Sequence, residues 1–240
     1  MNTLIQSQVI EVPVTEGTTI YKTQFASDKN FKFVSGIACL LVSGSVAQDI
    51  EIEFKDDNET IFTFSPAQNW VKDSEANNKD LTNIFRPVNI VSKGRNIYCS
   101  VKATDTDEVV KFVVYYLQVD SEEGVKVKPY NFETYRINFA SLPEYKNITL
   151  PNRYRNVAGI AAVTSNAAAS KILVHVENTQ KNLVDPIQLS AINVNAQTAY
   201  DLSFLPVVFP ADGQELKLYF TAADSVTGPV SAKVYFLLTD

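Results

Sequence analysis

The sequence predicts an all-β protein made of two tandem, internally duplicated antiparallel β-sandwiches. Three observations lead to this prediction. A segment in the middle of the 240-residue chain returns near its end. The composition favours strands, because 11 Tyr and 14 Phe accompany frequent Val, Ile and Thr. No stretch of ten or more residues shows the period of an amphipathic helix.

The duplication relates Phe85–Asp120 to Phe204–Asp240. Each copy is long enough to bury its own core. We therefore predict a first domain at residues 1–124 and a second at residues 125–240. The clearest correspondences are Phe85-Arg86-Pro87-Val88 with Phe204-Leu205-Pro206-Val207 and, at an offset one residue longer, Tyr115-Tyr116-Leu117 with Tyr235-Phe236-Leu237.

The first predicted strand is Val9–Val14. Pro13 places it at a sheet edge, because proline cannot donate to a ladder. We expect Glu16-Gly17 to turn the chain. A second strand follows at Ile20–Phe25 and ends at the polar turn Ser27–Asn30.

The third predicted strand is the run Phe31–Val42, which is apolar on both parities and is therefore expected to be buried on both faces. Its centre, Val34-Ser35-Gly36-Ile37-Ala38, returns as Val157-Ala158-Gly159-Ile160-Ala161. A glycine within a strand marks a bulge or a close backbone approach. We expect the same local geometry at Gly36 and Gly159.

A half-buried strand follows, in which Ile50, Ile52 and Phe54 alternate with charged residues. The turn Lys55–Glu59 leads into Thr60–Ser65, which completes a hairpin. The second copy repeats these features at Ile172, Val174 and Val176, at the turn Asn178–Asn182 and at Leu183-Val184.

A polar segment, Lys72–Asp80, interrupts the strands, with Trp70 at its start. We expect a long surface loop with room for one helical turn. Its counterpart, Ala191–Ala199, is shorter and less charged. The remaining predicted strands are Phe85–Ile90, Ile97–Ala103 and Val109–Val119, after which Ser121–Gly124 joins the copies and Tyr135–Phe139 opens the second.

The strand count favours one type of sandwich. About seven or eight short strands per copy, with one long connection, are typical of a jelly roll. An immunoglobulin-type sandwich predicts a Cys, Trp, Cys pattern or a tyrosine corner, and the sequence has neither.

Composition restricts the function. The net charge is −6 and no cluster of Lys and Arg is present, which argues against direct binding of nucleic acid. No apolar window is long enough for a transmembrane helix, and the N-terminus lacks the pattern of a signal peptide. We therefore expect a soluble protein that is made in the cytoplasm.

The two cysteines, Cys39 and Cys99, align with Ala162 and Leu218 of the second copy. Aliphatic counterparts favour buried free thiols over a disulfide. A single bridge stays open as the alternative if the two strands are neighbours.

Catalytic machinery is not predicted. A hydrolase of the Ser-His-Asp or Cys-His type needs a histidine, and the only one is His175. Its parity is opposite to that of Ile172, Val174 and Val176, so it is expected on the outer face, where Glu53 is its counterpart. We predict no enzymatic activity, no catalytic residue and no cofactor-binding residue.

Metal sites are also not predicted. One His and two separated Cys exclude a structural zinc site. Oxygen ligands for calcium are present in Asp56–Glu59 and Asp105–Glu108, but neither segment has the EF-hand pattern, and hairpin turns favour the same residues. Trp70, Tyr130 and Tyr135 are candidates either for stacking on a glycan or for an oligomer interface.

The duplicated motifs resemble a known family. Val-x-Gly-Ile-Ala, Phe-x-Pro-Val and the closing Tyr-(Tyr/Phe)-Leu-x-x-Asp occur once in each half, and the chain resembles the double jelly-roll capsid proteins of tailless double-stranded DNA viruses and related bacteriophages. At 240 residues the chain is short for that family, and the long loops that form towers there are nearly absent.

The resemblance implies a structural protein of the virion. Three subunits would form a homotrimeric, pseudo-hexameric capsomer that assembles with other virion proteins after synthesis in the host cytoplasm. The alternative is a virion accessory, head-fibre or tail module that binds a receptor or glycan through Trp70 and the loop Lys72–Asp80. An enzyme built on a β-sandwich is a third hypothesis.

Overall fold

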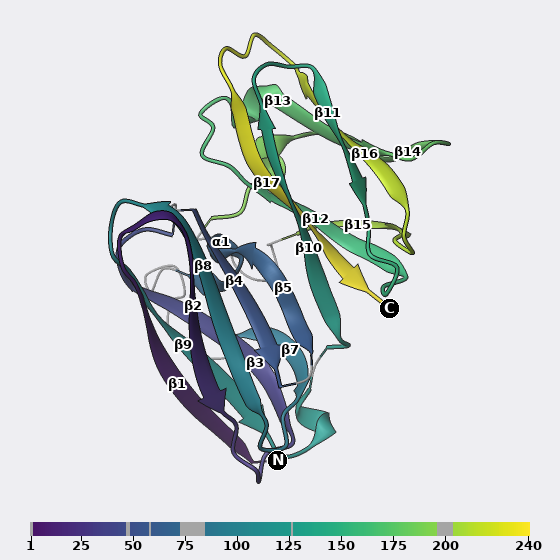
Figure 1. Ribbon diagram of the computed structural model, residues 1–240. Helices are drawn as coiled ribbons and strands as arrows, with labels where there is room; N and C mark the ends of the chain where they lie inside the picture. Colours follow the sequence, from purple (N-terminus) through teal and green to yellow (C-terminus); the bar gives the residue numbers. More distant parts are fainter. Residues whose placement is uncertain (1, 47–48, 58, 73–84, 126, 196–203) are drawn as a thin grey trace. The chain divides into compact units, whose positions relative to one another are not determined.

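The computed structural model describes residues 2–46, 49–57, 59–72, 85–125, 127–195 and 204–240, which form two compact units (Figure 1). The first contains the described residues up to Asn131 and also Asn195. The second contains those of Phe132–Val194 and Leu202–Asp240. The domain boundary at residues 124 and 125 stays a prediction. Residues 73–80 of the predicted surface loop, and residues 196–199 of its counterpart, lie outside the described residues.

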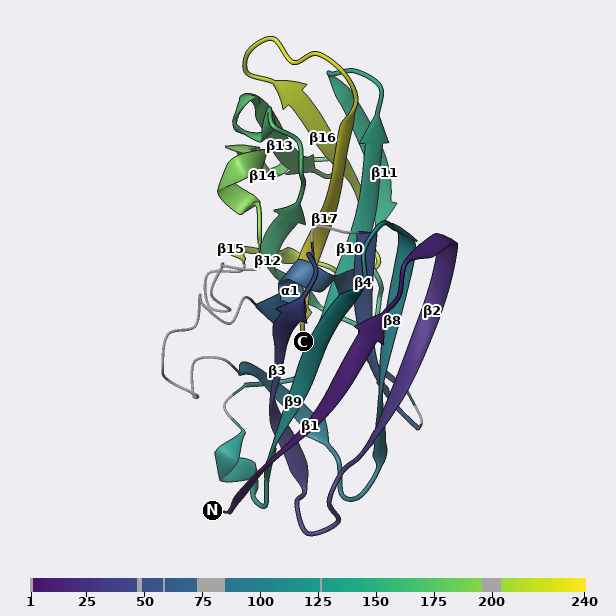
Figure 2. The same ribbon diagram turned by 90° about the vertical axis from the view of Figure 1, so that its left-hand side faces the viewer.

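The first unit is a sandwich of two sheets, seen from two directions in Figures 1 and 2. One sheet has the order β1-β9-β3, and both β6 and β7 pair with the remaining edge of β3. The other sheet has the order β2-β8-β4-β5. The strands are β1 (Thr3–Val12), β2 (Thr15–Ala26), β3 (Phe33–Ser43), β4 (Asp49–Asp56), β5 (Thr60–Pro66), β6 (Val71–Lys72), β7 (Arg86–Val91), β8 (Asn96–Thr106) and β9 (Val110–Val119).

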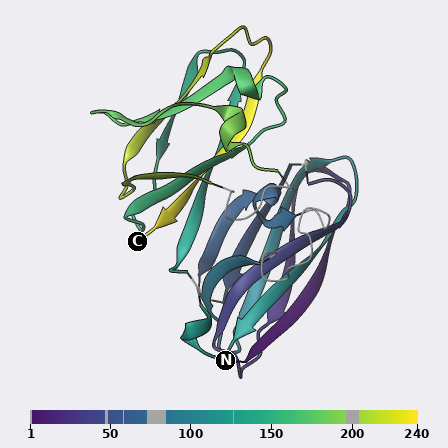
Figure 3. The ribbon, with the colours of Figure 1, turned by 180° about the vertical axis from the view of Figure 1, so that it is seen from behind.

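The second unit repeats this plan and is seen from behind, in teal through green to yellow, in Figure 3. Its sheets have the orders β10-β17-β12-β15 and β11-β16-β13-β14. Strand for strand, these orders match β1-β9-β3-β7 and β2-β8-β4-β5. The strands are β10 (Tyr130–Phe139), β11 (Glu144–Thr149), β12 (Asn156–Val163), β13 (Ile172–Glu177), β14 (Asn182–Gln188), β15 (Leu205–Pro210), β16 (Glu215–Ala222) and β17 (Val230–Thr239).

Both units are jelly rolls. The first and last strands of each unit are neighbours, and the chain crosses repeatedly between the two sheets of the sandwich. The predicted all-β fold of two duplicated antiparallel sandwiches is therefore confirmed. Each unit also contains a short parallel contact. In the first unit β6 is parallel to β3, and in the second Asn193 forms a parallel bridge with Ala162.

A short helical turn precedes this parallel contact in each unit. In the first unit it is α1 (Ala67–Trp70), which is followed by Val71 opposite Cys39. In the second it is η3 (Leu189–Ile192), followed by Asn193 opposite Ala162. The helical turn expected near Trp70 is therefore α1, and the duplication extends to this connection. Two further 3-10 turns are η1 (Glu122–Gly124) and η2 (Ala169–Lys171).

The repeated glycines lie at equivalent bulges. The register of β3 shifts between Val34 and Gly36, and that of β12 shifts between Val157 and Gly159. A Cβ atom at either glycine would lie 2.9 Å from the Cβ atom of Phe85 or Phe204, respectively. Both readings of a strand glycine, a bulge and a close approach, therefore apply at each position.

The core of the first unit is built around Trp70, which is fully buried. Its ring packs edge to face on Phe54 at 4.7 Å and on Phe62 at 5.1 Å, and its indole N–H donates to Ser65 Oγ at 2.8 Å. The expectation that Trp70 is an exposed aromatic at a loop is therefore wrong. The sequence indicated the helical turn but not that it is buried and directs the ring inward.

Two predictions about the N-terminal strands need correction. The first strand begins at Thr3 rather than Val9, because Thr3–Val12 pairs with β9 at ten consecutive positions. The chain turns at Pro13-Val14, and Gly17 lies within β2, at a register shift where its φ is +71°. The edge position of the first strand is confirmed, since β1 ends its sheet.

Candidate functional site

His175 lies on the outer face of the second unit, as predicted. Its ring stacks on Tyr219 with centroids 4.7 Å apart and an interplanar angle of 3°, and Tyr145 is 5.3 Å from Tyr219 on the next strand. His175 Nδ1 forms no hydrogen bond with the described residues, whereas a catalytic histidine needs an orienting partner there. The three rings form a cross-strand ladder that packs the sheet surface.

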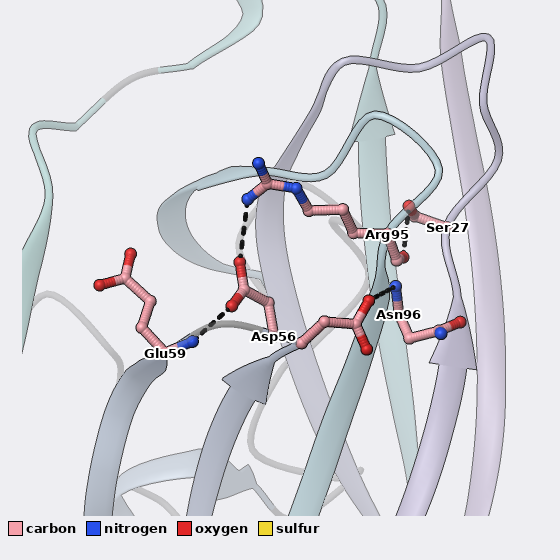
Figure 4. Close-up of polar contacts among 6 residues, drawn as sticks. Ser27, Asp56, Glu59, Arg95 and Asn96 are labelled. Atoms are coloured by element: carbon pink, nitrogen blue, oxygen red, sulfur yellow. Dashed lines mark hydrogen bonds and ion pairs between the residues drawn. The ribbon is translucent and has the colours of Figure 1, made fainter.

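The acidic turn at Asp56 and Asp57 stabilises the fold (Figure 4). Asp56 accepts the backbone N–H of Glu59 at 2.8 Å and pairs with Arg95 at 3.2 Å. Asp57 accepts the backbone N–H of Asn96 at 3.3 Å and the hydroxyl of Tyr98 at 2.9 Å. Ser27 closes the cluster by donating to the carbonyl of Arg95. These carboxylates join β4 to the start of β8.

The second acidic turn has the same structural role. Asp105, with φ at +47°, accepts the backbone N–H of Gly17 at 2.7 Å. The hydroxyl of Thr106 accepts the N–H of Thr15 and donates to the carbonyl of Pro13. Within the described ranges, no three His, Cys, Asp or Glu residues are grouped so that they could hold a metal ion.

Both cysteines are free and fully buried. Burial raises the pKa of each thiol well above its ordinary value. A thiol that stays protonated is a poor nucleophile and a poor metal ligand. The prediction of buried free thiols is confirmed, and Cys39 and Cys99 belong to the core.

Among the described residues of the first unit, two cationic side chains are buried, and the sequence alone did not reveal them. Lys72 is 1% exposed and Arg86 is 4% exposed. Lys72 donates to the carbonyl of Gln68 at 3.0 Å, and Arg86 donates to the carbonyl and Oδ1 of Asn69 at 2.8 and 2.7 Å. The Arg86 guanidinium lies 5.3 Å from the centre of the Trp70 ring.

The environment of Lys72 changes its protonation. Burial, together with the charge of Arg86, lowers the pKa of Lys72 from 10.5 to about 7. The equivalent positions in the second unit are apolar, because Val194 follows Asn193 as Lys72 follows Val71, and Leu205 corresponds to Arg86. The one feature of the sequence that pointed to these buried cations is a difference between the copies: Arg86 stands in the first copy where the otherwise repeated motif has Leu205 in the second.

The two remaining candidate aromatics have roles in the fold. Tyr130 donates to the carbonyl of Pro87 at 2.8 Å and packs against Phe62, and Tyr135 donates to the carbonyl of Thr149 at 2.7 Å. Burial raises the pKa of both phenols. Trp70 and Tyr130 are therefore held by contacts within the first unit, and Tyr135 by a contact within the second, rather than offered to a glycan.

An apolar surface lies on the outer face of the β1-β9-β3 sheet. Ile5 is 48% exposed and Val9 is 56% exposed, and across the ladder they face Leu117 and Val113. Leu40, Tyr115 and Leu117 are partly buried there around Ala38 and Phe85. Apolar surface of this kind is typical of interaction sites.

No family model matches the chain, and no curated protein matches it in sequence. Among solved structures, the fold is similar to that of the major capsid protein P2 from bacteriophage PM2. That match covers 98% of this chain and 97% of P2, with 9% sequence identity and a TM-score of 0.50. PBCV-1 VP54, fitted into a reconstruction of the virophage Sputnik, is 10% identical with a TM-score of 0.49 over 98% of this chain and 93% of VP54.

The likeness to P2 is a likeness of fold. It confirms the double jelly-roll resemblance inferred from the repeated motifs. It also shows that a chain of about this length accommodates the double jelly-roll fold, since almost all of P2 is matched. Among the described helices, none is long and apolar enough to span a membrane.

Proposed function

We propose that this chain is a structural protein of a virion and serves as a capsid subunit. The observation that carries the proposal is the duplicated jelly roll, which corresponds end to end to the fold of P2, a protein described as a major capsid protein. Three chains would supply six similar sandwiches, which suits a trimeric, pseudo-hexameric capsomer. The subunit would be made in the host cytoplasm and would act in the virion with other virion proteins.

The side-chain chemistry is consistent with a role in assembly. The carboxylates, thiols and aromatic rings singled out as reactive or ligand-binding candidates hold turns, strands or cores in place. A net charge of −6 disfavours direct contact with packaged nucleic acid. We therefore propose a non-enzymatic subunit whose partners are further copies of itself and other virion proteins.

A receptor-binding or glycan-binding accessory protein is the weaker proposal. It depended on Trp70 and the loop Lys72–Asp80. Trp70 and Lys72 are both buried. Tyr145, at the exposed end of the ladder, is approached by the ammonium of Lys217 at 5.4 Å. No described residue favours this alternative.

Light scattering of the purified protein, over a range of protein and salt concentrations, tests the proposal. A trimer, or regular particles visible by electron microscopy, is the expected result. Salt should favour the association, because it screens the repulsion between acidic chains. A strict monomer at every concentration would contradict a shell subunit, and binding to glycans and cell surfaces would then be measured.

A further inference from the structure

We propose that β1 pairs antiparallel with the β1 strand of a second chain of this protein, around a twofold axis at Ser7. The two sheets would join edge to edge. This contact goes beyond the proposed capsomer, because a twofold contact is distinct from the threefold contacts of a trimer.

The free edge of β1 is open to such pairing. Within the described part of the chain, β1 pairs with β9 alone, at ten consecutive positions without a register shift (Figure 2). Towards β2, the structure shows a side-chain hydrogen bond from Gln8 to the carbonyl of Gln24 at 3.0 Å. No main-chain hydrogen bond joins the free edge to the described residues. Natural edge strands are often protected by charged residues, proline or a bulge, and β1 has one charged residue near its end, Glu11, with no lysine, proline or register shift.

The sequence of β1 identifies a second copy as its partner. From Leu4 to Ile10 it reads Leu-Ile-Gln-Ser-Gln-Val-Ile, which is a palindrome in chemical class around Ser7. An antiparallel pair centred on Ser7 places like beside like. The pairs are Leu4 with the partner's Ile10, Ile5 with the partner's Val9, Gln6 with the partner's Gln8, and Ser7 with the partner's Ser7.

This register also matches the two faces of the sheet. Each pair joins residues of the same parity, so exposed Ile5 and Val9 would cover one another on the outer face. Apolar cross-strand pairs of this kind stabilise a sheet. On the inner face, Gln8 Oε1 is buried and has no hydrogen-bond partner among the described residues. The partner's Gln6 amide is a suitable donor.

Electrostatics favours the same location. A chain with a net charge of −6 repels its copy over most surfaces. Glu11 is the only charged residue of β1, it pairs with Lys111 at 3.2 Å, and in this register it lies opposite the partner's Thr3. No like charges face each other across the proposed ladder.

The contact is expected to be weak in solution. A single ladder between two edge strands is smaller than a standard interface, which buries about 1,200–2,000 Å². Dimers should therefore depend on protein concentration. Several such contacts in one assembly would strengthen each other, because each one raises the effective concentration of the next.

Disulfide trapping with S7C tests the register. At the twofold axis the two new thiols lie opposite each other, where Cα atoms are about 4.5–5.5 Å apart, within the range of a disulfide. Cys39 and Cys99 are buried, so a mild oxidant acts on the introduced thiol. T3C and E11C are matched controls, because both positions are exposed on the same face of β1.

We expect S7C to form a disulfide-linked dimer, and T3C and E11C to remain unlinked when each is alone. A mixture of T3C and E11C chains should link, because these positions face each other in the proposed register. Equal linking of all three single variants would indicate random collision and overturn the proposal. Absence of linking in S7C would also overturn it, as expected if another protein or another part of this chain covers β1.

The result is independent of the test of the proposed function. Trimers or particles without linking of S7C would remove the strand pairing and leave the shell role intact. Linking of S7C in a protein that forms dimers and nothing larger would support the pairing and count against the shell role. A V9K substitution added to S7C places a lysine opposite the partner's Ile5, and it should abolish linking without unfolding the chain.

Discussion

In the first unit the helical turn α1 places Trp70 in the core, whereas the equivalent turn η3 of the second unit places Ile192 there. Two residues after the turn, the buried position is Lys72 in one unit and Val194 in the other. The main chain follows a similar course at both sites, through a short helical turn into a parallel contact, although the turn is α-helical in the first unit and 3-10 in the second. This backbone arrangement therefore accommodates either aromatic and cationic core side chains or aliphatic ones.

The outer faces of the equivalent sheets β2-β8-β4-β5 and β11-β16-β13-β14 differ in the same way. In the first unit Lys102 pairs with Glu51, and Lys55 pairs with Glu53 at 3.1 Å. In the second unit the position of Glu53 is taken by His175, within the ladder of aromatic rings. By contrast, both units have a glycine where an aromatic Cβ leaves no space. The duplication is strict where the backbone is crowded and permissive elsewhere.

Trp70→Ala should have the largest effect on the difference between the units. It removes a fully buried ring, two edge-to-face contacts and the hydrogen bond to Ser65. We expect a loss of about 3–5 kcal/mol in the free energy of unfolding of the first unit. Ile192→Ala is the matched control and should lower only the stability of the second unit. Urea denaturation followed by far-UV circular dichroism measures both, and equal changes in one shared transition would contradict the comparison.

Gly36→Ala and Gly159→Ala should cost the same in the two units. The added Cβ meets another Cβ, which no rotamer can move away. We expect each substitution to cost about 1–3 kcal/mol. Trp70 is the only tryptophan, so its fluorescence reports the first unit and should respond to Gly36→Ala alone. Gly17→Ala has no crowding within 4 Å and serves as a control for backbone strain; it should cost about 1 kcal/mol.

Lys72→Met should remove a pH dependence that the second unit lacks. The pKa of Lys72 is about 7 in the folded chain and 10.5 ordinarily. Between these values the unfolded chain binds a proton that the folded chain does not, so stability rises with pH. Relative to Lys72→Met, the free energy of unfolding of the wild type should rise by up to ~1.4 kcal/mol per pH unit between pH 7 and pH 10.5. Urea midpoints from Trp70 fluorescence at several pH values measure this, and parallel curves would refute it.

Tyr219→Ser converts the centre of the ladder to the residue of the first unit, Ser100. The substitution removes the contacts of Tyr219 with both His175 and Tyr145. Because the site is on a sheet surface, we expect a loss of about 1 kcal/mol. His175→Glu, which introduces the counterpart Glu53, breaks only one of the contacts and should cost less. The second unfolding transition in circular dichroism is the measurement, and an equal loss in both variants would mean that the contact between Tyr219 and Tyr145 adds no stability of its own.

Sequence patterns predicted the parts of this fold that depend on periodicity and repetition. The alternation at Ile50, Ile52 and Phe54, and the repeated Gly36 and Gly159, led to the correct strands, bulges and duplicated sandwich. The start of β1 was missed because Thr3–Gln8 contains few strongly apolar residues, and its pairing with β9 is a long-range property. Long-range pairing has no local signature.

Features of the candidate surfaces were predicted less well, for a related reason. The polar segment after Trp70 indicated a loop, yet one helical turn before it was enough to bury both Trp70 and Lys72. The burial of Arg86 depends on Asn69, which accepts its hydrogen bonds from another element. Burial of a charged side chain follows from tertiary neighbours, and periodicity does not report them.

Cys39→Ala should have the smallest effect, since it introduces the residue that the second unit has at the same place, Ala162. The alanine fits the same strand pairing, and only one sulfur atom is lost from the core. We expect a cost of about 1 kcal/mol. In the wild type, the raised pKa of both thiols should keep them unreactive towards a thiol reagent in the folded state. The rate of labelling should then follow unfolding of the first unit and rise modestly in Cys39→Ala, where Cys99 alone reacts. Rapid labelling of the folded wild type would show that the interior of the first unit opens readily, despite its large aromatic core.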